Sequence, residues 1–550
     1  MSLFGFADLH CHPMSHLGFG GATIAPSGRR FFFGLLDNGV SATPDPGYAL
    51  PCCRPAHMVN LLLPLLVDQA HGQGRGYPEF DWPTHRTILH QQMYFEWMKR
   101  AWQGGLRLMC ALAVHNKLMA WMYDYPTGTD LGDTAAVRAQ LTAMKRFAGR
   151  HHAWMQIVTS SDEARACIAA GRLAVVLGTE VDSLGELRSE GDATPGAVDA
   201  LLSQLHADGV RAITPIHLAN NAFGGCAIYD DLFNLSNHFL GQDSKHRFFR
   251  VRGGALNNGV EYRLGLASGS TVIRNAYLNY VRRRPRPGAV ELEFPDYGAA
   301  NPSASCNEVG LTGAGQRFLK GMMKRGMLID TDHMSELARD AALTLAEAHA
   351  FPVYSSHSTL RELALSRAES APSSLWGCAH EGMLTLRQLE RIRELGGLVA
   401  PMTNMGPTRS HRGLPATPQA YREDDTSLSW MNGYAYAVEK MAGKGGVALG
   451  TDFNGFARQP GPRFVKGRAP AGPVTGVTYD ADRPVYTLGS KRFDFNEMGL
   501  AHYGLLPDFL SDAEVVLQRP ALETLYRSAE AYCDMWKRCE ERAQALGGIA

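Results

Sequence analysis

The sequence lacks an excess of either charge, and it lacks the cysteine spacing of a disulfide or zinc scaffold. Its 54 Lys and Arg residues balance its 54 Asp and Glu residues, so the formal net charge is zero. Such a chain has no broad basic field for nucleic acid or for an anionic membrane surface. Its 10 cysteines are scattered through 550 residues without a C-x-x-C pair. This pattern argues against a disulfide framework and against a cysteine-ligated structural zinc.

Long apolar runs are also missing. The most apolar early run, residues 58–67, has about half of the ~20 residues that a membrane-spanning helix needs, and Pro64 interrupts it. The N-terminal sequence MSLFGFADLHCHP shows no basic segment followed by an apolar one, as a secretory signal requires. We expect a cytoplasmic protein with no nucleic-acid or membrane partner, and the sequence leaves a homodimer open.

The composition that is present is that of a chain with a large core. Hydrophobic residues make up 45% of the sequence and charged residues 20%. At roughly 150 residues per domain the length allows three or four domains, but a single barrel with insertions also fits.

Apolar, β-branched runs alternate with helix-like segments along the chain. The apolar runs predict eight strands, at residues 4–10, 107–115, 173–180, 210–217, 327–332, 352–357, 397–403 and 447–452. The helical patterns lie at residues 87–102, 134–150, 197–208, 313–324, 335–350 and 385–395, with a last stretch at about 511–546. Eight strands alternating with helices predict an α/β fold, a (β/α)8 TIM barrel of parallel strands.

Two long segments break this alternation. Residues 18–86 are rich in Gly and Pro, and residues 219–311 include a basic RRRPRP stretch. Both are too long for ordinary barrel connections, so we interpret them as loop insertions that cap one face, and the arginines as a solvated loop. Residues 459–484 form a third loop-like region. We expect residues 1–550 to form a single barrel with a C-terminal helical extension.

Residue types that bind metals follow the strands in order. The first strand ends in His10 and His12, and side chains two apart in an extended segment point the same way, so both imidazoles can reach one ion. Later strands end at or shortly before Glu180, His217, His333, His357 and Asp452. In a β/α barrel these carboxyl ends converge on one face, where active sites form. In a chain with 20 histidines each position alone is weak, but the ordered set predicts a site.

The chemistry of metal hydrolases explains these residue types. Imidazole nitrogen and carboxylate oxygen are the usual ligands of a catalytic zinc, which keeps one position open for water. A carboxylate can bridge two ions, and two ions together clamp and acidify a shared hydroxide. An acid outside the ligand set can carry the proton between nucleophile and leaving group.

Simpler interpretations exist for single residues. Glu180 could pair with an arginine, and His217 could only support the turn that follows it. Asp330 or Asp332 could replace the histidine of the fifth strand as its functional group. His115, at the end of the second strand, could join the site or could mark a strand–helix junction.

The strand ends lie in sequence blocks that resemble the membrane dipeptidase (renal dipeptidase) family within the amidohydrolase superfamily. The blocks are ADLHCHP, TSSDEARACIAAGRLAVVLGTE, RAITPIHLANN, RGMLIDTDHMS, FPVYSSHS and VALGTDFNG. They span most of the chain outside the insertions. The resemblance implies a barrel with a binuclear site for two divalent ions, which we expect to be zinc.

The resemblance also implies roles by position. The implied ligands are His10 and His12 for one metal, His333 and His357 for the other, and Glu180 as the bridge between them. His217 would polarise the scissile carbonyl and stabilise the oxyanion. Asp452 would transfer the proton. In this family an arginine shortly after the sixth-strand histidine grips the substrate carboxylate, and Arg367 is the nearest candidate here.

Three departures from the family pattern stand out. The first strand has H-x-H where the family generally has H-x-D, which removes one negative charge and can alter metal preference or the acidity of the bridging water. The eighth block reads DFNG where DFDG is commoner. The insertions lie where substrate loops would be, so the substrate need not be a dipeptide.

We therefore predict a zinc-dependent hydrolase that cleaves the amide bond of a dipeptide or similar small amino-acid amide, by attack of a metal-bridging hydroxide. The same binuclear site would also suit a lactonase, a phosphoesterase or a deaminase of the amidohydrolase superfamily. A second alternative is a non-catalytic, metal-binding barrel whose insertions bind a partner.

Overall fold

In the part of the chain that the structure describes, eight parallel strands form a closed ring. The computed structural model describes residues 3–19, 32, 34–37, 46–50, 83–118, 120, 132–229, 233–240, 248–253, 305–365, 379–414, 426–462 and 485–548. The strands of the ring are β1 (Phe6–Cys11), β2 (Leu106–His115), β4 (Leu173–Val181), β5 (Val210–Thr214), β8 (Leu328–Ile329), β9 (Ser355–Ser358), β10 (Leu398–Pro401) and β11 (Gly446–Val447). Each of them overlaps one of the eight strands that the sequence predicted.

The ring closes through two short parallel contacts. One sheet runs in the order β1-β2-β4-β5-β8 and another in the order β11-β10-β9. A bridge between Asp330 and Tyr354 joins β8 to β9, and a bridge between Asp8 and Leu449 joins β11 to β1. The short strand β3 (Met155–Ile157) pairs with the start of β4 and was not predicted. The predicted α/β barrel is confirmed.

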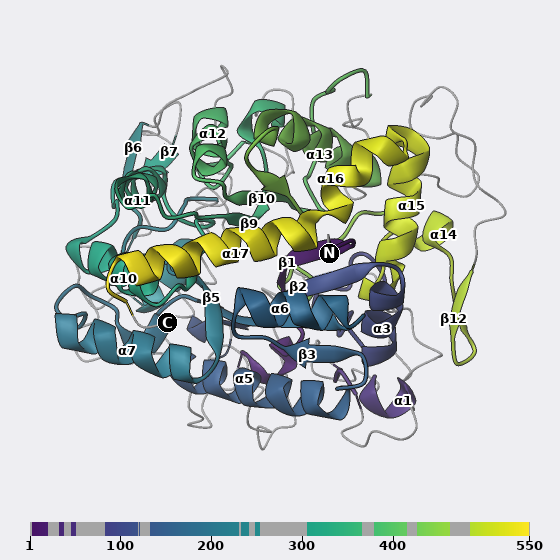
Figure 1. Cartoon of the computed structure of the whole chain (residues 1–550), viewed down its shortest axis with the longest axis horizontal. Helices are drawn as coiled ribbons and strands as arrows, with labels where there is room; N and C mark the ends of the chain where they lie inside the picture. Colours follow the sequence, from purple (N-terminus) through teal and green to yellow (C-terminus); the bar gives the residue numbers. More distant parts are fainter. Residues whose placement is uncertain are drawn as a thin grey trace, which may run out of the picture.

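Helices connect the strands and cover the outside of the ring (Figure 1). They are α3 (Phe95–Gln103), α5 (Asp133–Arg150), α6 (Ser161–Ala169), α7 (Pro195–Ala207), α10 (Gly313–Lys324), α11 (Glu336–Ala348), α12 (Leu386–Glu394) and α13 (Ser427–Met441). Hydroxyl side chains begin several of them, because an N-cap oxygen accepts one of the backbone N–H groups that the first turn leaves unpaired. Thr385 and Gln388 form a complete capping box on α12.

The first predicted helix begins eight residues later than expected, at Phe95 rather than at residue 87. Side chains occupy the backbone N–H groups that a helix would need there, since Met93 N donates to Oε1 of Gln91 and Gln92 N donates to Oδ1 of Asn454. Helices α6 and α13 were not predicted.

The C-terminal stretch is broken into several helices rather than continuous. It comprises α15 (Leu506–Leu517), the 3-10 turn η7 (Arg519–Leu522), α16 (Glu523–Tyr526) and α17 (Ser528–Ala545). Gln518 has a left-handed φ of 68°, and Pro520 follows, so no single helix can pass this point.

Helix α17 lies across the end of the barrel at which the strands begin (Figure 1). A Cβ atom built on Gly326, which precedes β8, would lie 3.4 Å from Cα of Glu540, and one on Gly446, at the start of β11, would lie 2.9 Å from Cβ of Ala531. Small residues at the strand starts therefore let the helix approach closely. The opposite end of the barrel, where the strands finish, is left for the polar residues described below.

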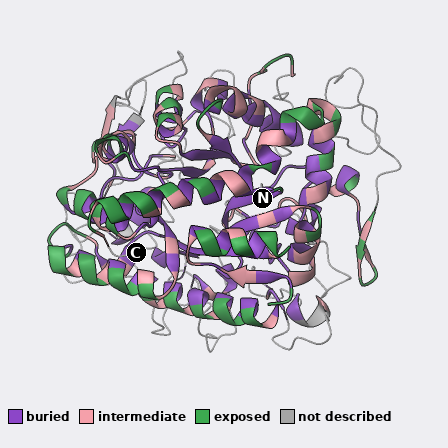
Figure 2. Cartoon of the chain, viewed as in Figure 1, coloured by how far each residue is buried: buried purple, intermediate pink, exposed green. Residues whose placement is uncertain are grey.

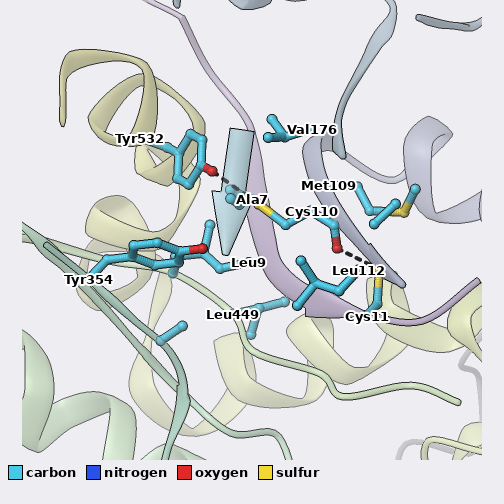
Figure 3. Close-up of a cluster of buried hydrophobic side chains, with 14 of the residues drawn as sticks. Ala7, Leu9, Cys11, Met109, Cys110, Leu112, Val176, Tyr354, Leu449 and Tyr532 are labelled. Atoms are coloured by element: carbon cyan, nitrogen blue, oxygen red, sulfur yellow. Dashed lines mark hydrogen bonds between the residues drawn. The ribbon is translucent and has the colours of Figure 1, made fainter. Parts of the chain in front are cut away.

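The barrel strands are buried, and the helices expose their outer faces (Figure 2). Alternate residues of β1, including Leu9 and Cys11, belong to the apolar cluster in Figure 3. There the Cys110 thiol donates to the hydroxyl of Tyr532, on α17, at 3.2 Å. The histidines of β1 occupy the positions between these apolar residues, as the period of two in a strand requires.

Smaller elements lie outside the ring. They are the antiparallel pairs β6 (Val251–Gly253) with β7 (Ser305–Asn307) and β12 (Tyr486–Leu488) with β13 (Lys491–Phe493), the short helices α1 (Pro46–Ala49), α8 (Asn234–Leu240) and α14 (Phe495–Met498), and the 3-10 turns η1 (Ser15–Leu17), η3 (Leu184–Glu186), η5 (Arg361–Leu363) and η6 (Tyr503–Leu505). Much of both proposed insertions, including the RRRPRP stretch, lies outside the described residues. Their interpretation as insertions into a single barrel stays a prediction. None of the described helices has the length and the apolar character needed to cross a membrane.

Candidate metal centre

The end of β1 carries two imidazoles that point the same way, as the H-x-H spacing predicted. Nε2 of His10 and Nε2 of His12 lie 3.1 Å apart, and both side chains are fully buried. Nδ1 of His12 lies 3.1 Å from the carbonyl oxygen of Leu112. A carbonyl only accepts hydrogen bonds, so Nδ1 carries a proton, and Nε2 is the nitrogen that faces the site.

Glu180, at the end of β4, lies between this pair and a second one. Its Oε2 is 3.0 Å from Nε2 of His10 and 3.2 Å from Nε2 of His12. Its other oxygen, Oε1, is 3.1 Å from Nε2 of His333. The two carboxylate oxygens thus face different imidazoles, which is the arrangement that a carboxylate bridging two ions requires.

The second pair of imidazoles comes from the β8 and β9 strand ends. Nε2 of His333 and Nε2 of His357 lie 2.8 Å apart. His333 has a left-handed φ of 61°, a conformation that costs roughly 1–3 kcal/mol and persists only where the surroundings hold it. The segment after β5 holds it, because Ala227 N donates to the carbonyl oxygen of His333 at 2.6 Å and the Tyr229 hydroxyl lies 2.7 Å from its Nδ1.

Asp452 follows β11, the strand next to β1 in the ring, and its side chain lies close to His10 and His12. Its Oδ1 lies 3.1 Å from Nε2 of His12 and 3.8 Å from Nε2 of His10. Its φ is 48°, again left-handed. A Cβ atom on Gly455 would lie 1.8 Å from Oδ1 of Asp452. The glycine of the DFNG block is therefore required for the backbone to turn past the aspartate.

The structure explains the asparagine of DFNG. Nδ2 of Asn454 donates to the carbonyl oxygen of His12 at 3.2 Å and to Oε1 of Gln91 at 2.7 Å, while its Oδ1 accepts from Gln92 N. An ionised carboxylate at this position could not donate either bond. The residue therefore fastens the turn after β11 to the end of β1.

His217, three residues beyond β5, lies beside the bridging carboxylate. Its Nε2 is 3.9 Å from Oε2 of Glu180, and its Nδ1 is 3.0 Å from Oδ1 of Asp182. The other oxygen of Asp182 accepts from Nδ2 of Asn116 at 2.7 Å. His217 therefore borders the centre without approaching Glu180 as closely as His10, His12 and His333 do.

All five histidines are oriented alike. Each directs Nε2 toward Glu180 or toward another imidazole, and each directs Nδ1 toward a group of the surrounding protein. The Nδ1 partners are Ser356 for both His10 and His357, Leu112 for His12, Asp182 for His217 and Tyr229 for His333. This is the arrangement of histidine ligands, in which a partner on one ring nitrogen fixes the tautomer and leaves the other nitrogen for a metal.

His12 and His357 have a raised pKa, which favours the form protonated on both ring nitrogens. Burial opposes this, but Asp452 and Glu180 raise the pKa of His12 to about 9. For His357 burial is likewise outweighed, mainly by Asp332, and the pKa rises to about 10.

The carboxylate at the middle of the centre and the innermost histidine shift the opposite way. Burial alone would raise the pKa of Glu180, but His10 and His217 hold it well below its ordinary value. Burial lowers the pKa of His10 to about 4. The centre thus combines ionised carboxylates, retained protons and a neutral imidazole, and a divalent cation can take the place of the protons.

Three groups of side chains within the described residues could hold an ion. They are His10, His12 and Asp452; His10, Asp330 and His357; and Glu180, His333 and His357. Together the groups contain seven side chains, four of them imidazoles and three carboxylates, and such nitrogen and oxygen donors suit zinc or a similar borderline ion. The geometry thus keeps His333 in the site, whereas Asp332 belongs to none of the three groups. Asp330 faces Nδ1 of His10 at 4.0 Å, on the side of the ring away from Glu180.

Two other sequence candidates have different outcomes. His115 belongs to none of the three groups; its Nδ1 accepts from Phe19 N at 2.9 Å, and its Nε2 lies 3.9 Å from Oδ1 of Asp133. Arg367 lies outside the described residues, so its contact with a substrate carboxylate stays a prediction.

Sequence reasoning missed the groups behind the histidines, namely Ser356, Asp182 and Tyr229. Ser356 stands directly before His357 in the SSHS of β9, and Asp182 stands two residues after Glu180. Both positions were visible as polar residues at strand ends. Tyr229 follows β5 by 15 residues, and no spacing rule would have connected it with His333.

Part of the chain matches a known family. Residues 293–462 match the model of the membrane dipeptidase family, Peptidase family M19. This segment contains four of the predicted site residues, namely His333, His357, Arg367 and Asp452.

Several solved structures resemble the chain at low sequence identity. A dipeptidase AC, a metallo peptidase of family M19, is 15% identical, with 83% of this chain and 90% of that chain covered and a TM-score of 0.44. A metallo peptidase from Rhodobacter sphaeroides, liganded with a phosphinate mimic of the dipeptide L-Ala-D-Ala, is 15% identical, covering 80% and 89% with a TM-score of 0.44. The probable dipeptidase PvdM from Pseudomonas aeruginosa is 11% identical, covering 84% and 90% with a TM-score of 0.45.

Proposed function

We propose, from the match of residues 293–462 to the membrane dipeptidase family of metallopeptidases, that the chain is a member of this family and hydrolyses the amide bond of a dipeptide or a similar small amino-acid amide. The reaction would take place at the strand-finish end of the barrel, among the histidines and carboxylates that converge on Glu180. The substrate would be a small molecule, and the cofactor two divalent ions, which we propose to be zinc.

The proposed ligands divide into two halves. His10 and His12 would hold one ion, His333 and His357 the other, and Glu180 would bridge them, since its two oxygens face the two halves at 3.0–3.2 Å. Ions held there would polarise the amide carbonyl and lower the pKa of the attacking water.

Two further side chains would carry the chemistry around the ions. Asp452 would accept the proton of the attacking water and deliver it to the leaving amine; its position 3.1 Å from Nε2 of His12 supports a role at the edge of the centre. His217, whose Nδ1 faces Asp182 at 3.0 Å, would be protonated on both ring nitrogens, because Glu180 and Asp182 raise its pKa against the effect of burial. It would then donate from Nε2 to the oxygen that becomes negatively charged in the tetrahedral intermediate. Arg367 would bind the substrate carboxylate.

One observation carries this proposal. Five imidazoles from the ends of four different strands direct Nε2 toward a single buried carboxylate or toward one another, with contacts between 2.8 and 3.9 Å. Burying this many titratable groups together is costly unless an ion or a proton compensates for them. Metal binding accounts for the arrangement with one cause.

The test combines metal analysis with a dipeptide panel. The purified chain should contain close to two divalent ions, and it should release free amino acids from some dipeptides in a chelator-sensitive way. His333→Ala and His357→Ala should each empty one site and abolish hydrolysis. His115→Ala is the matched control, since it removes a buried histidine outside the three candidate groups, and it should retain both ions.

The opposite results would decide against the proposal. A preparation free of metal and fully active would rule out the mechanism. Two bound ions with no activity on any dipeptide would instead favour the lactonase, phosphoesterase or deaminase alternative, and His12 in place of the usual carboxylate is the observation that keeps this second candidate. Lactones and phosphotriesters should therefore be assayed beside the dipeptides.

A further inference from the structure

The hydroxyl of Ser356 lies between the two halves of the centre. Its Oγ is 2.7 Å from Nδ1 of His10 and 2.9 Å from Nδ1 of His357. It also donates to Oδ2 of Asp330 at 2.5 Å. Both Ser356 and Asp330 are completely buried. One small group therefore contacts a histidine from each half.

The hydrogen-bonding capacity of a serine hydroxyl matches these three contacts. A hydroxyl has one proton to donate and two lone pairs that accept. With the proton directed to Asp330, the two lone pairs can each accept an Nδ1–H, one from His10 and one from His357. In the neutral form that binds a metal, both histidines then carry their single proton on Nδ1, and both Nε2 atoms have a lone pair directed at the centre.

The surroundings hold this geometry in place. Oδ2 of Asp330 also accepts from the hydroxyl of Thr214 at 3.0 Å, and its Oδ1 accepts from Ser356 N at 3.3 Å. The rings of His10 and His357 lie with centroids 3.7 Å apart at 32° to each other. The two rings are close together and tilted, and both Nδ1 atoms lie on the side where the one hydroxyl reaches them.

Resting on the proposed binuclear centre, we propose that Ser356, anchored by Asp330, is a positioning residue that fixes the tautomer and the ring orientation of one histidine in each ion site. Its loss should weaken both sites together, because the hydroxyl is shared. Outer partners of metal-binding histidines typically contribute about 10–100-fold to metal affinity. By contrast, the hydroxyl of Tyr229 faces one histidine of the centre, His333, and would serve one site.

A competing partner exists for one of the two histidines. Oδ2 of Asp332 lies 3.4 Å from Nδ1 of His357, farther than the serine hydroxyl. This carboxylate is already engaged, since it accepts the backbone N–H of His357 at 2.8 Å and the hydroxyl of Ser355 at 2.6 Å. The two assignments differ in what the removal of Ser356 should do to the second ion.

The experiment compares two serine-to-alanine variants in the full chain. Ser356→Ala removes the shared hydroxyl. Ser358→Ala is the matched control, because Ser358 lies on the same strand, is buried, and has a hydroxyl without a hydrogen-bond partner among the described residues. Zn²⁺ affinity is measured by chelator competition with ion counts per chain, and the ligand field by the visible absorption of the Co²⁺-loaded protein.

Ser356→Ala should lower the affinity for both ions by about 10–100-fold and shift the Co²⁺ spectrum. Ser358→Ala should behave like the unchanged protein. Wild-type affinity for both ions in Ser356→Ala would overturn the proposal. A loss confined to one ion would also overturn it, by assigning His357 to Asp332. Circular dichroism establishes that the variant folds. If it does not, Asp330→Asn, which keeps the volume, should show the same paired loss, and wild-type affinity there would overturn the proposal.

The outcomes separate this inference from the proposed function. If the unchanged protein binds two ions but hydrolyses no dipeptide, the proposed substrate is wrong. The comparison of the two serine variants would still decide the role of Ser356. Normal hydrolysis with equal metal affinity in both serine variants would remove only the role of Ser356. An unchanged protein that binds no ion would remove both.

Discussion

Where the barrel strands begin, helix α17 covers the opening with apolar side chains, whereas where they finish, buried imidazoles and carboxylates face one another. Tyr532, Met535 and Trp536 of α17 are fully buried. At the other end, His10 and Glu180 are as thoroughly buried but are polar. The two ends differ in chemistry rather than in exposure.

The difference separates stability from function along the barrel axis. Apolar burial stabilises by about 25 cal/mol per Å², whereas burying polar groups costs free energy unless they are paired. The strand-finish end also contains His333 and Asp452 in left-handed backbone conformations, each costing roughly 1–3 kcal/mol. We infer that apolar burial at the strand-start end offsets the free-energy cost of the polar and strained residues at the strand-finish end.

The largest effect should come from a change at the polar end. Asp452→Asn keeps the shape of the side chain but removes its ability to carry a proton, so turnover should fall by about 10²–10⁴-fold. Because the proposed ligands are unchanged, both ions should remain, and the far-UV circular dichroism should match that of the unchanged protein. Steady-state hydrolysis and ion counts measure this. Loss of an ion in Asp452→Asn would make the aspartate a ligand rather than the proton carrier.

The reverse pattern is expected at the apolar end. Trp536→Ala removes a completely buried indole from α17 and should lower the free energy of unfolding by about 3–5 kcal/mol. The metal content and the turnover of the fraction that stays folded should not change. Urea unfolding followed by circular dichroism measures the loss, and Val515→Ala on α15, 46% exposed, should shift it by no more than about 0.5 kcal/mol. A Trp536→Ala protein that is stable but inactive would break the separation of the two ends.

The parts of the molecule that the sequence predicted depend on local pattern. An apolar run followed at once by a histidine or carboxylate is visible in one stretch of chain, and so β4 with Glu180 and β9 with His357 were both predicted. Helix α13 was missed because most of its residues are buried, among them Trp430, Asn432 and Tyr434. It therefore lacks the amphipathic period that indicates a helix.

The groups behind the histidines depend on long-range contact instead. Ser356 is 346 residues from His10, and Tyr229 is 104 residues from His333. Only closure of the ring brings such pairs together, since neither member carries a local mark of its partner. The sequence could therefore predict the histidines of the centre, but not the hydrogen bonds that orient them.

A pH effect of intermediate size should also distinguish the ends. The Glu381 carboxylate accepts backbone N–H groups from Ile228, Asn307 and Glu336 near the strand-finish loops. Burial raises its pKa from 4.5 to about 7, although these bonds lower it in part. The folded chain thus binds a proton that the unfolded chain releases between these values, so the contribution of Glu381 to stability is largest below pH 4.5 and is lost as the pH rises to about 7.

Glu381→Gln should remove this part of the pH dependence. At about 1.4 kcal/mol per pKa unit, the difference in unfolding free energy between the two proteins should change by roughly 3 kcal/mol across that range. Urea unfolding at several values between pH 4.5 and pH 8 measures it. Parallel pH profiles for the two proteins would contradict the assignment to Glu381.

The smallest effect should come from the flank of the barrel, away from both ends. Thr385 and Gln388 cap the first turn of α12 reciprocally, so Thr385→Ala leaves a backbone N–H without its acceptor and should cost about 1 kcal/mol of unfolding free energy. Its metal affinity and turnover should equal those of the unchanged protein, because α12 provides none of the proposed ligands. Unfolding curves and ion counts on the same preparation measure both. If this modest loss also weakened metal binding, stability and function would be coupled around the ring, and the contrast between the two ends would be one of composition alone.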